Sequence, residues 1–282
     1  MAGKKPIVAL MYDFDKTLCT RDMQEYAFIP KIGMKADEFW TESNSLARKE
    51  KMDQILAYMY LMLKKSRITE QSIFRKDFVC AGKTVEFYPG VIDWFDRIDA
   101  FGEAQNLHVE HYIISSGLRE IIEGTPIKGK FKSIYASEFL YDENNIAVWP
   151  KLAINYTAKT QFLFRINKGV LDVSENTPLN QYAPDRDRRV PFSHMIYIGD
   201  GLTDVPCMKL VKLNGGTSIA VYPNRKTPGV KQLLKDKRVD FIAQAEYSDG
   251  KELDQIVRET ITKIAAANQL VLRHAKQMKG LK

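Results

Sequence analysis

The sequence predicts an α/β fold, in which a doubly wound parallel sheet carries a helical domain inserted after its first strand. Short, continuous apolar runs alternate along the chain with amphipathic helical patterns, as expected for parallel strands that are covered on both faces. From about Arg21 to Lys83, in contrast, only helical pattern is present. We therefore expect a core domain formed by residues 1–19 and 86–282 and a helical cap domain over residues 20–85.

The strands of the sheet are predicted from five apolar runs: residues 6–14, 108–116, 131–139, 194–200 and 217–222. A turn signal at 142–145 lies between two apolar stretches, so residues 137–150 are predicted to form a β-hairpin or flap. Helices are expected over 90–106 and 251–279, and the polar, proline-containing segment 173–192 is expected to be an exposed loop.

The inserted segment has one clear amphipathic stretch, residues 46–65. Met52, Ile55, Leu56, Met59 and Leu63 recur there at the spacing of one helix face. We interpret this stripe as a packed helix surface rather than as a ligand site. Because ligands bind beyond the carboxyl ends of the strands in open α/β sheets, the insertion is expected to cover the site as a lid.

Composition excludes several classes of protein. The chain carries a formal net charge of +7, but its lysines and arginines are scattered and lack aromatic stacking platforms, so no nucleic-acid partner is expected. No run approaches the roughly 20 apolar residues that span a bilayer, so no membrane partner is expected. The three cysteines are widely spaced and the first apolar run is too short for a signal sequence, which favours a cytoplasmic location.

Two acidic pairs follow predicted strands. Asp13 and Asp15 end the first strand in the sequence DFDKT, and Asp200 and Asp204 follow the strand predicted at 194–200. Neighbouring carboxylates resist joint ionisation unless a cation shares them, and a hard divalent ion prefers such oxygen ligands. The four aspartates therefore predict a Mg²⁺ site.

Two further elements supply groups that suit a phosphate or another oxyanion. Ser115 and Ser116 close an apolar run and Gly117 precedes a helical pattern, so small hydroxyls and free backbone N–H groups are expected at a helix N-terminus. Lys159 stands at the start of another helical pattern, where its ammonium group can reach an anion. Each of these features, the two acidic pairs, the 115–117 segment and Lys159, is weak evidence by itself. Together, in this order and each at an element boundary, the four features indicate a catalytic site.

In these residues the sequence resembles the haloacid dehalogenase (HAD) superfamily of phosphohydrolases. The DFDKT segment, Ser115 in IISSG, Lys159 and the acidic GDGLTD segment match the four motifs of that superfamily in order. The resemblance implies a Rossmann-like core, Asp13 as the nucleophile that forms an aspartyl-phosphate, and Asp15 as the general acid and base. It also implies that Asp13, Asp200 and the backbone carbonyl of Asp15 hold Mg²⁺.

The same resemblance implies roles for the remaining candidate residues. Residues 115–117 and Lys159 are expected to bind the phosphoryl oxygens and to offset the charge that grows during transfer. Asp204 is expected either to bind through the water shell of the metal or to orient Lys159. Thr17 is expected to brace the turn beside the nucleophile, at the edge of the phosphate site.

A helical insertion between the first and second motifs is similar to the cap of the phosphoserine phosphatase-like branch, and such a lid favours a small phosphorylated metabolite. Phosphoserine phosphatases carry a glutamate nine residues after the nucleophile, where this chain has Asp22. Two interpretations of Asp22 stay open: it meets a substrate amino group, or it caps the first inserted helix. A cap arginine for a substrate carboxylate is not singled out, because Arg48, Arg67 and Arg75 are all candidates.

The leading hypothesis is a Mg²⁺-dependent phosphatase for a small phosphomonoester. One alternative is a phosphotransferase or mutase that uses the same aspartyl-phosphate, and a less favoured one is a non-catalytic HAD-like binding protein. The sequence gives no indication of the oligomeric state.

Overall fold

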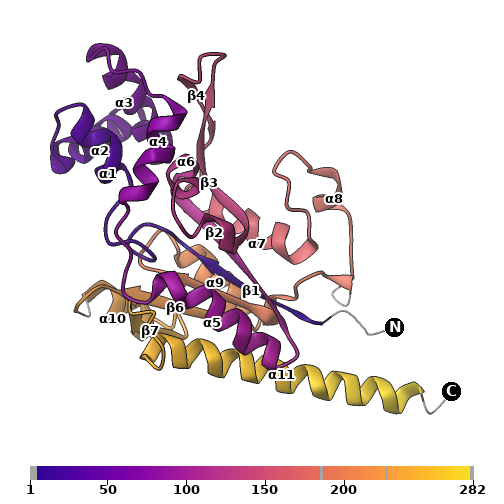
Figure 1. Ribbon diagram of the computed structural model, residues 1–282. Helices are drawn as coiled ribbons and strands as arrows, with labels where there is room; N and C mark the ends of the chain where they lie inside the picture. The colour runs from indigo at the N-terminus through magenta and orange to yellow at the C-terminus, as the bar shows by residue number, and fades with distance from the viewer. Residues whose placement is uncertain (1–4, 185–186, 226–227, 280–282) are drawn as a thin grey trace.

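The structure is a computed structural model that describes residues 5–184, 187–225 and 228–279. A seven-stranded sheet runs through it in the order β4-β3-β2-β1-β5-β6-β7 (Figure 1). The strands are β1 (Ile7–Tyr12), β2 (His108–Leu118), β3 (Phe131–Tyr141), β4 (Ala147–Leu152), β5 (Met195–Gly199), β6 (Thr217–Tyr222) and β7 (Phe241–Gln244). Neighbouring strands pair in parallel, except that β4 pairs antiparallel with β3.

Helices cover both faces of this sheet, which confirms the predicted doubly wound α/β fold. Successive side chains of a strand point to opposite faces. Leu10 and Tyr12 of β1 belong to one core cluster, together with residues of α5 (Val91–Ala104), α6 (Arg119–Glu123) and α11 (Glu252–Lys279). Ala9 and Met11 belong to the other cluster, together with residues of α7 (Ala158–Lys168), α9 (Val205–Leu213) and α10 (Pro228–Lys235).

The inserted segment is helical, as predicted. It forms α1 (Gln24–Lys31), α2 (Ala36–Glu50), α3 (Gln54–Ile68) and α4 (Arg75–Ala81), which lie together beyond one end of the sheet in Figure 1. Tyr58 of α3 donates a hydrogen bond to the carbonyl of Ser116, near the end of β2, with an oxygen–oxygen distance of 2.8 Å. The insertion therefore covers the carboxyl end of the sheet, where the acidic segments lie.

The amphipathic stripe predicted across residues 46–65 is partly wrong, because the chain turns within it. Lys51 adopts a left-handed φ of 53°, and the Asp53 carboxylate accepts hydrogen bonds from the N–H groups of Ile55 and Leu56 to begin α3. Met52 consequently precedes the helix, and Leu56 is exposed. The buried face of α3 consists instead of Ala57, Tyr58, Met59, Leu61, Met62, Leu63 and Ser66.

The hairpin predicted over residues 137–150 is confirmed. β3 and β4 pair antiparallel, and the Asp142 carboxylate accepts hydrogen bonds from the N–H groups of Asn144 and Ile146 in the turn. The expected loop over 173–192 includes the short helix α8 (Thr177–Asn180), and its Asp185 and Arg186 lie outside the described residues. Within the described ranges, no helix has an apolar stretch of the length that spans a bilayer.

Candidate active site

Three aspartates converge where β1 and β5 end. The two strands are neighbours in the sheet, and the Asp13 N–H donates to the Ile198 carbonyl at 3.0 Å, which extends their pairing into the acidic segment. Asp13, Asp200 and Asp204 each offer a carboxylate oxygen, and these oxygens lie within 4.8 Å of one another. Among the described residues, this is the one such group of three or more metal-ligating side chains.

Lys159 is fully buried and bridges two of these aspartates. Its Nζ atom lies 3.1 Å from Oδ1 of Asp13 and 2.8 Å from Oδ1 of Asp204. Burial by itself would lower the pKa of this ammonium group, but the charges of the two carboxylates outweigh burial and raise the pKa. Lys159 is therefore a permanent cation inside the acidic group.

Asp204 holds Lys159 in place. It is completely buried, and its Oδ1 atom also accepts a hydrogen bond from the Tyr197 hydroxyl at 2.8 Å. A Cβ atom on Gly199 would lie 2.5 Å from Oδ2 of Asp204, so only glycine allows this close approach without a shift. Of the two expected roles of Asp204, the structure shows the contact that orients Lys159.

The electrostatics of the group fit a divalent cation. Burial raises the pKa of Asp13 to about 6, against the opposing charge of Lys159. Burial, followed by the charges of Asp204 and Asp13, raises the pKa of Asp200 well above its usual range. Within the described residues, the Asp200 carboxylate receives no hydrogen bond. Three carboxylates thus surround one buried lysine, with a smaller contribution of positive charge from Lys16 at Asp200, and an oxygen-only donor set of this kind suits Mg²⁺.

Asp15 points away from this group, towards the start of the helical insertion. Its Oδ1 atom accepts a hydrogen bond from the Met23 N–H at 2.9 Å. A Cβ atom on Gly117 would lie 2.8 Å from its Oδ2 atom, so the end of β2 also approaches it closely. Burial, followed by the charges of Asp22 and Asp13, raises the pKa of Asp15 well above its usual range, which favours the protonated form that a general acid needs.

Residues 115–117 differ from the expected helix N-terminus. β2 continues to Leu118, and α6 starts only at Arg119. The Gly117 N–H donates to Oγ of Ser115 at 3.0 Å, and the Leu118 N–H contacts the sulfur of Met23 at 2.9 Å. These two N–H groups are therefore engaged within the protein, because Ser115 and the side chain of Met23 provide partners that the sequence pattern does not show.

Two hydroxyl groups near the site have no partner. Thr17 is completely buried, and its Oγ1 atom makes no hydrogen bond with the described residues. The same holds for the buried Oγ atom of Ser116. Buried polar atoms are ordinarily hydrogen-bonded, so two unused hydroxyls beside the catalytic candidates indicate groups that a ligand or water can engage.

Asp22 neither caps a helix nor stands free. α1 has Met23 as its N-cap residue and no side-chain capping bond, so the capping interpretation is wrong. Instead the Asp22 carboxylate pairs with Nζ of Lys16 at 2.6 Å. Lys16, inside the DFDKT segment, adopts a left-handed φ of 56°, and this turn brings its side chain back to Asp22.

The candidate cap arginines lie elsewhere. Arg48 and Arg67 are exposed. Arg75 forms an ion pair with Glu123 of α6 at 2.5 Å. In the part of the chain that the structure describes, none of the three contacts the acidic group.

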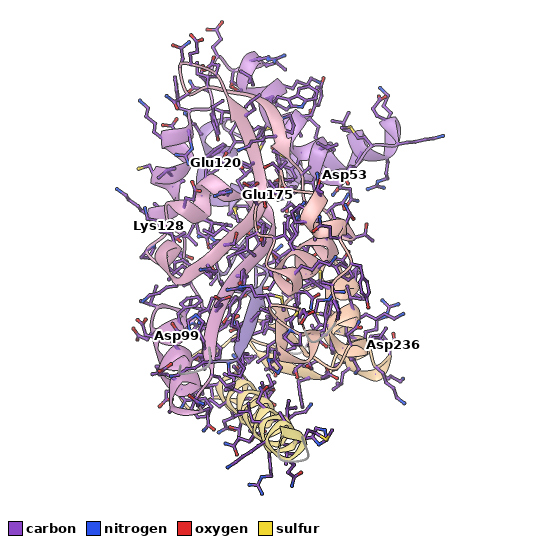
Figure 2. The ribbon with its side chains drawn as sticks, turned by 90° about the vertical axis from the view of Figure 1, so that its right-hand side faces the viewer. Asp53, Asp99, Glu120, Lys128, Glu175 and Asp236 are labelled. Carbon is purple, nitrogen blue, oxygen red and sulfur yellow. The ribbon has the colours of Figure 1, made fainter. Side chains whose placement is uncertain are left out.

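The helical insertion also contacts the core beside Lys159. Asp53 accepts a hydrogen bond from the side-chain amide of Asn155, and Gln54 accepts one from the Tyr156 hydroxyl at 3.2 Å. Figure 2 shows Asp53 where the inserted helices meet the core. Asn155 and Tyr156 lie just before Thr157, the N-cap residue of α7, and the Asn155 side chain accepts a hydrogen bond from the Ala158 N–H, so the insertion is connected to the first turn of the helix that carries Lys159.

Sequence reasoning missed several neighbours of the candidate residues. Tyr197 and Tyr58 lie in apolar patterns that predict only packing, and Met23 and Gln24 carry no motif. Lys16 stands inside the first motif, but its partner Asp22 becomes apparent only when the turn is known. No pattern along the chain marks these contacts, because each depends on elements that are distant in sequence or on a local turn.

A sequence model of the haloacid dehalogenase-like hydrolases matches residues 10–209, a span that contains every residue of the site described above. The chain belongs to the haloacid dehalogenase-like hydrolase family. An uncharacterized protein of Borreliella burgdorferi is 27% identical to it over 299 residues, covering 93% of this chain and 99% of that protein.

Solved structures of HAD proteins share the fold. A HAD family hydrolase from Salmonella enterica is 14% identical and has a TM-score of 0.59, with 90% of this chain and 71% of that chain covered. A phosphoserine phosphatase, solved as an analogue of its phospho-aspartyl intermediate, is 15% identical with a TM-score of 0.56, covering 90% of this chain and 99% of its own. At these identities the likeness concerns the fold.

Proposed function

We propose that this HAD protein is a Mg²⁺-dependent phosphatase that hydrolyses a small phosphomonoester through an aspartyl-phosphate on Asp13, with residues 20–85 as a cap domain. The observation that carries the proposal is the convergence of Asp13, Asp200 and Asp204, with the buried Lys159 paired to the first and the last of them. Membership of a hydrolase family supports the class of reaction. The shared fold with a phosphoserine phosphatase supports the phosphoryl chemistry.

The acidic group supplies the ligands for the metal ion. Asp13 and Asp200 would hold Mg²⁺ together with the backbone carbonyl of Asp15, while Asp204 is occupied by Lys159. When bound, the ion supplies positive charge that polarises the phosphoryl group and permits the neighbouring carboxylates to ionise together.

The side chains then divide the reaction between them. The Asp13 carboxylate, held by the Phe14 N–H at 2.7 Å and by Lys159, attacks phosphorus. The bond between phosphorus and the ester oxygen breaks, and the carboxyl group of Asp15 gives its proton to that oxygen, which leaves as an alcohol.

The second half-reaction regenerates the enzyme. The Asp15 carboxylate takes a proton from a water molecule that attacks phosphorus. The bond between phosphorus and Asp13 breaks, which releases inorganic phosphate and restores both carboxyl groups to their starting protonation states. Lys159 offsets the negative charge of the phosphoryl oxygens in both steps.

The test is Asp13→Asn, which keeps the size of the side chain and removes the nucleophile. We expect purified wild-type protein with Mg²⁺ to release phosphate from p-nitrophenyl phosphate without any acceptor other than water, and EDTA to stop it. Asp13→Asn should lose at least about a thousandfold in kcat, with an unchanged circular dichroism spectrum. Asp96→Asn, at an exposed carboxylate paired with Lys130, is the matched control and should behave as wild type. Turnover that survives in Asp13→Asn would refute the nucleophile, and transfer only to an added acceptor would indicate a phosphotransferase.

A further inference from the structure

We infer that Gln24, Tyr58 and Ser116 form an uncharged polar subsite for the leaving group, and that the substrate presents a hydroxyl group there. The substrate class is then the phosphate ester of a polyhydroxy alcohol, such as a polyol or a sugar. This inference rests on the proposed phosphatase function, because it identifies the alcohol that leaves when the ester bond breaks.

The location of the subsite follows from the contacts of Asp15, the acid that protonates the leaving oxygen. The Met23 N–H donates to Asp15, and Gly117 approaches the same carboxylate closely. Gln24 is the residue after Met23, and Ser116 is the residue before Gly117. Both side chains therefore come from the two segments that enclose Asp15.

Tyr58 of the insertion completes the enclosure from the side of α3. Its hydroxyl donates to the Ser116 carbonyl at 2.8 Å. Burial raises the pKa of this hydroxyl, whereas the side chains of Ser137 and Gln24 both act to lower that pKa, which places them beside it. Tyr58 is 3% exposed and Gln24 is 2% exposed. Tyr58 thus lies at the centre of a small, buried polar group between the insertion and the sheet.

This group has hydrogen-bonding capacity that the protein does not use. The Oε1 atom of Gln24 and the Oγ atom of Ser116 are buried and have no partner among the described residues. Buried polar atoms in proteins are ordinarily paired, so these two atoms point to a ligand group that can both donate and accept. A hydroxyl group does both, since it donates to Gln24 and accepts from Ser116.

The charges around the group disfavour an anionic ligand. Asp22, which stands where phosphoserine phosphatases carry a glutamate, is paired with Lys16 at 2.6 Å. Arg75 is paired with a glutamate of α6, and Arg48 and Arg67 are exposed. A carboxylate in the subsite would therefore be buried near two other carboxyl groups without a free cation to pair with, which is strongly unfavourable, whereas a hydroxyl is satisfied there.

The experiment compares phosphate esters matched in carbon chain. Glycerol 3-phosphate is paired with n-propyl phosphate, sorbitol 6-phosphate with n-hexyl phosphate, and O-phosphoserine is added as a charged leaving group. In at least one pair, we expect the wild-type kcat/KM for the hydroxylated ester to exceed that for its alkyl partner by about tenfold or more, as expected when a hydrogen bond to a buried polar group is lost. O-phosphoserine should be a poorer substrate than the preferred polyol ester.

Two variants assign this preference to the subsite. Gln24→Met and Tyr58→Phe keep the side-chain volume and remove polar atoms, so both should reduce the ratio of kcat/KM between the paired esters towards one. Gln71→Met is the matched control, because Gln71 is an exposed glutamine of the same insertion, and it should keep the wild-type ratio. Circular dichroism of each variant verifies that it is folded. If Gln24→Met does not fold, Tyr58→Phe alone decides the test.

The outcomes separate this inference from the function on which it rests. If wild-type protein hydrolyses neither p-nitrophenyl phosphate nor any of these esters, the proposed phosphatase function is refuted. If it hydrolyses them with equal kcat/KM within both pairs, or prefers O-phosphoserine, the polyol subsite is refuted and the phosphatase stands. A wild-type ratio in both folded variants would also refute the subsite.

Discussion

Gly199, the last residue of β5, is the position at which one added methyl group perturbs the site most directly. A Cβ atom there would lie 2.5 Å from both Cγ and Oδ2 of Asp204. This is about 1 Å shorter than an optimal contact between carbon atoms. The backbone of Gly199 does not have a positive φ, so the contact with Asp204 is the reason that alanine does not fit.

The expected loss of stability in Gly199→Ala depends on how firmly Asp204 is held. It is fully buried, and its two hydrogen bonds to Lys159 and Tyr197 are each 2.8 Å long. Moving the carboxylate by about 1 Å would stretch both bonds beyond hydrogen-bonding distance. Overpacking and the loss of a charged hydrogen bond each cost about 1–3 kcal/mol, so we expect Gly199→Ala to lower the free energy of unfolding by about 3 kcal/mol. Because Lys159 loses its anchor, kcat should fall by about tenfold or more.

The assay is urea unfolding followed by fluorescence, together with steady-state turnover of p-nitrophenyl phosphate. Gly201→Ala is the matched control in the same motif, because a Cβ atom there meets nothing within 4 Å and the φ of Gly201 is not positive. Its free energy of unfolding should change by less than about 0.5 kcal/mol. If the two alanine variants were equally stable, Asp204 would be free to move, and the argument that it fixes Lys159 would be refuted.

Two further predictions concern the surroundings of the site. Asn155→Ala removes a side chain that accepts a hydrogen bond from a first-turn N–H of α7 at 3.2 Å and donates one to Asp53, so urea titration should show a loss of about 1 kcal/mol or more, whereas the exposed Thr157→Ala should show none. Equal losses would contradict this assignment. Burial alone would raise the pKa of Glu110, but the hydrogen bonds from Arg189, at 2.7 and 2.5 Å, help to lower the pKa below 4.5. The stability that this carboxylate contributes is therefore present above pH 4.5 and is lost as the pH falls through the lowered pKa. Glu110→Gln should consequently reduce the difference between the unfolding free energies at pH 7 and pH 3. An unchanged difference would contradict this role of Glu110.

The strands that hold the site could be predicted because their signal is local. Continuous apolar runs identified β1, β2, β3, β5 and β6, and the acidic residues follow directly where two of these strands end. β7 was missed because it is a four-residue edge strand whose sequence, FIAQ, has only one buried side chain. The prediction of one amphipathic stripe over residues 46–65 was partly wrong because Lys51 and Asp53 interrupt the helix. They do so through backbone conformation and capping, which the spacing of hydrophobic residues does not reveal.

The candidate residues could be identified from motifs, but their partners could not. The contacts of Asp204 with Lys159 and of Tyr58 with Ser116 join segments that are 45 and 58 residues apart. The pairing of Lys16 with Asp22 depends on a left-handed turn that a lysine rarely adopts. These contacts are decided by tertiary structure, which a single sequence without an alignment does not reveal.

The position of β1 in the sheet has a consequence for how the protein is made. β1 is synthesised before the two strands that flank it, yet it lies in the middle of the sheet, where Ile7 pairs with His108 and Ala9 pairs with Met195. Its apolar side chains therefore leave the ribosome long before either neighbouring strand, and pairing over such sequence separations is slow and exposes the chain to aggregation. Asp13 gains its hydrogen bond to the sheet only when Ile198 has been synthesised. The proposed nucleophile therefore reaches its final position only after most of the chain has been translated.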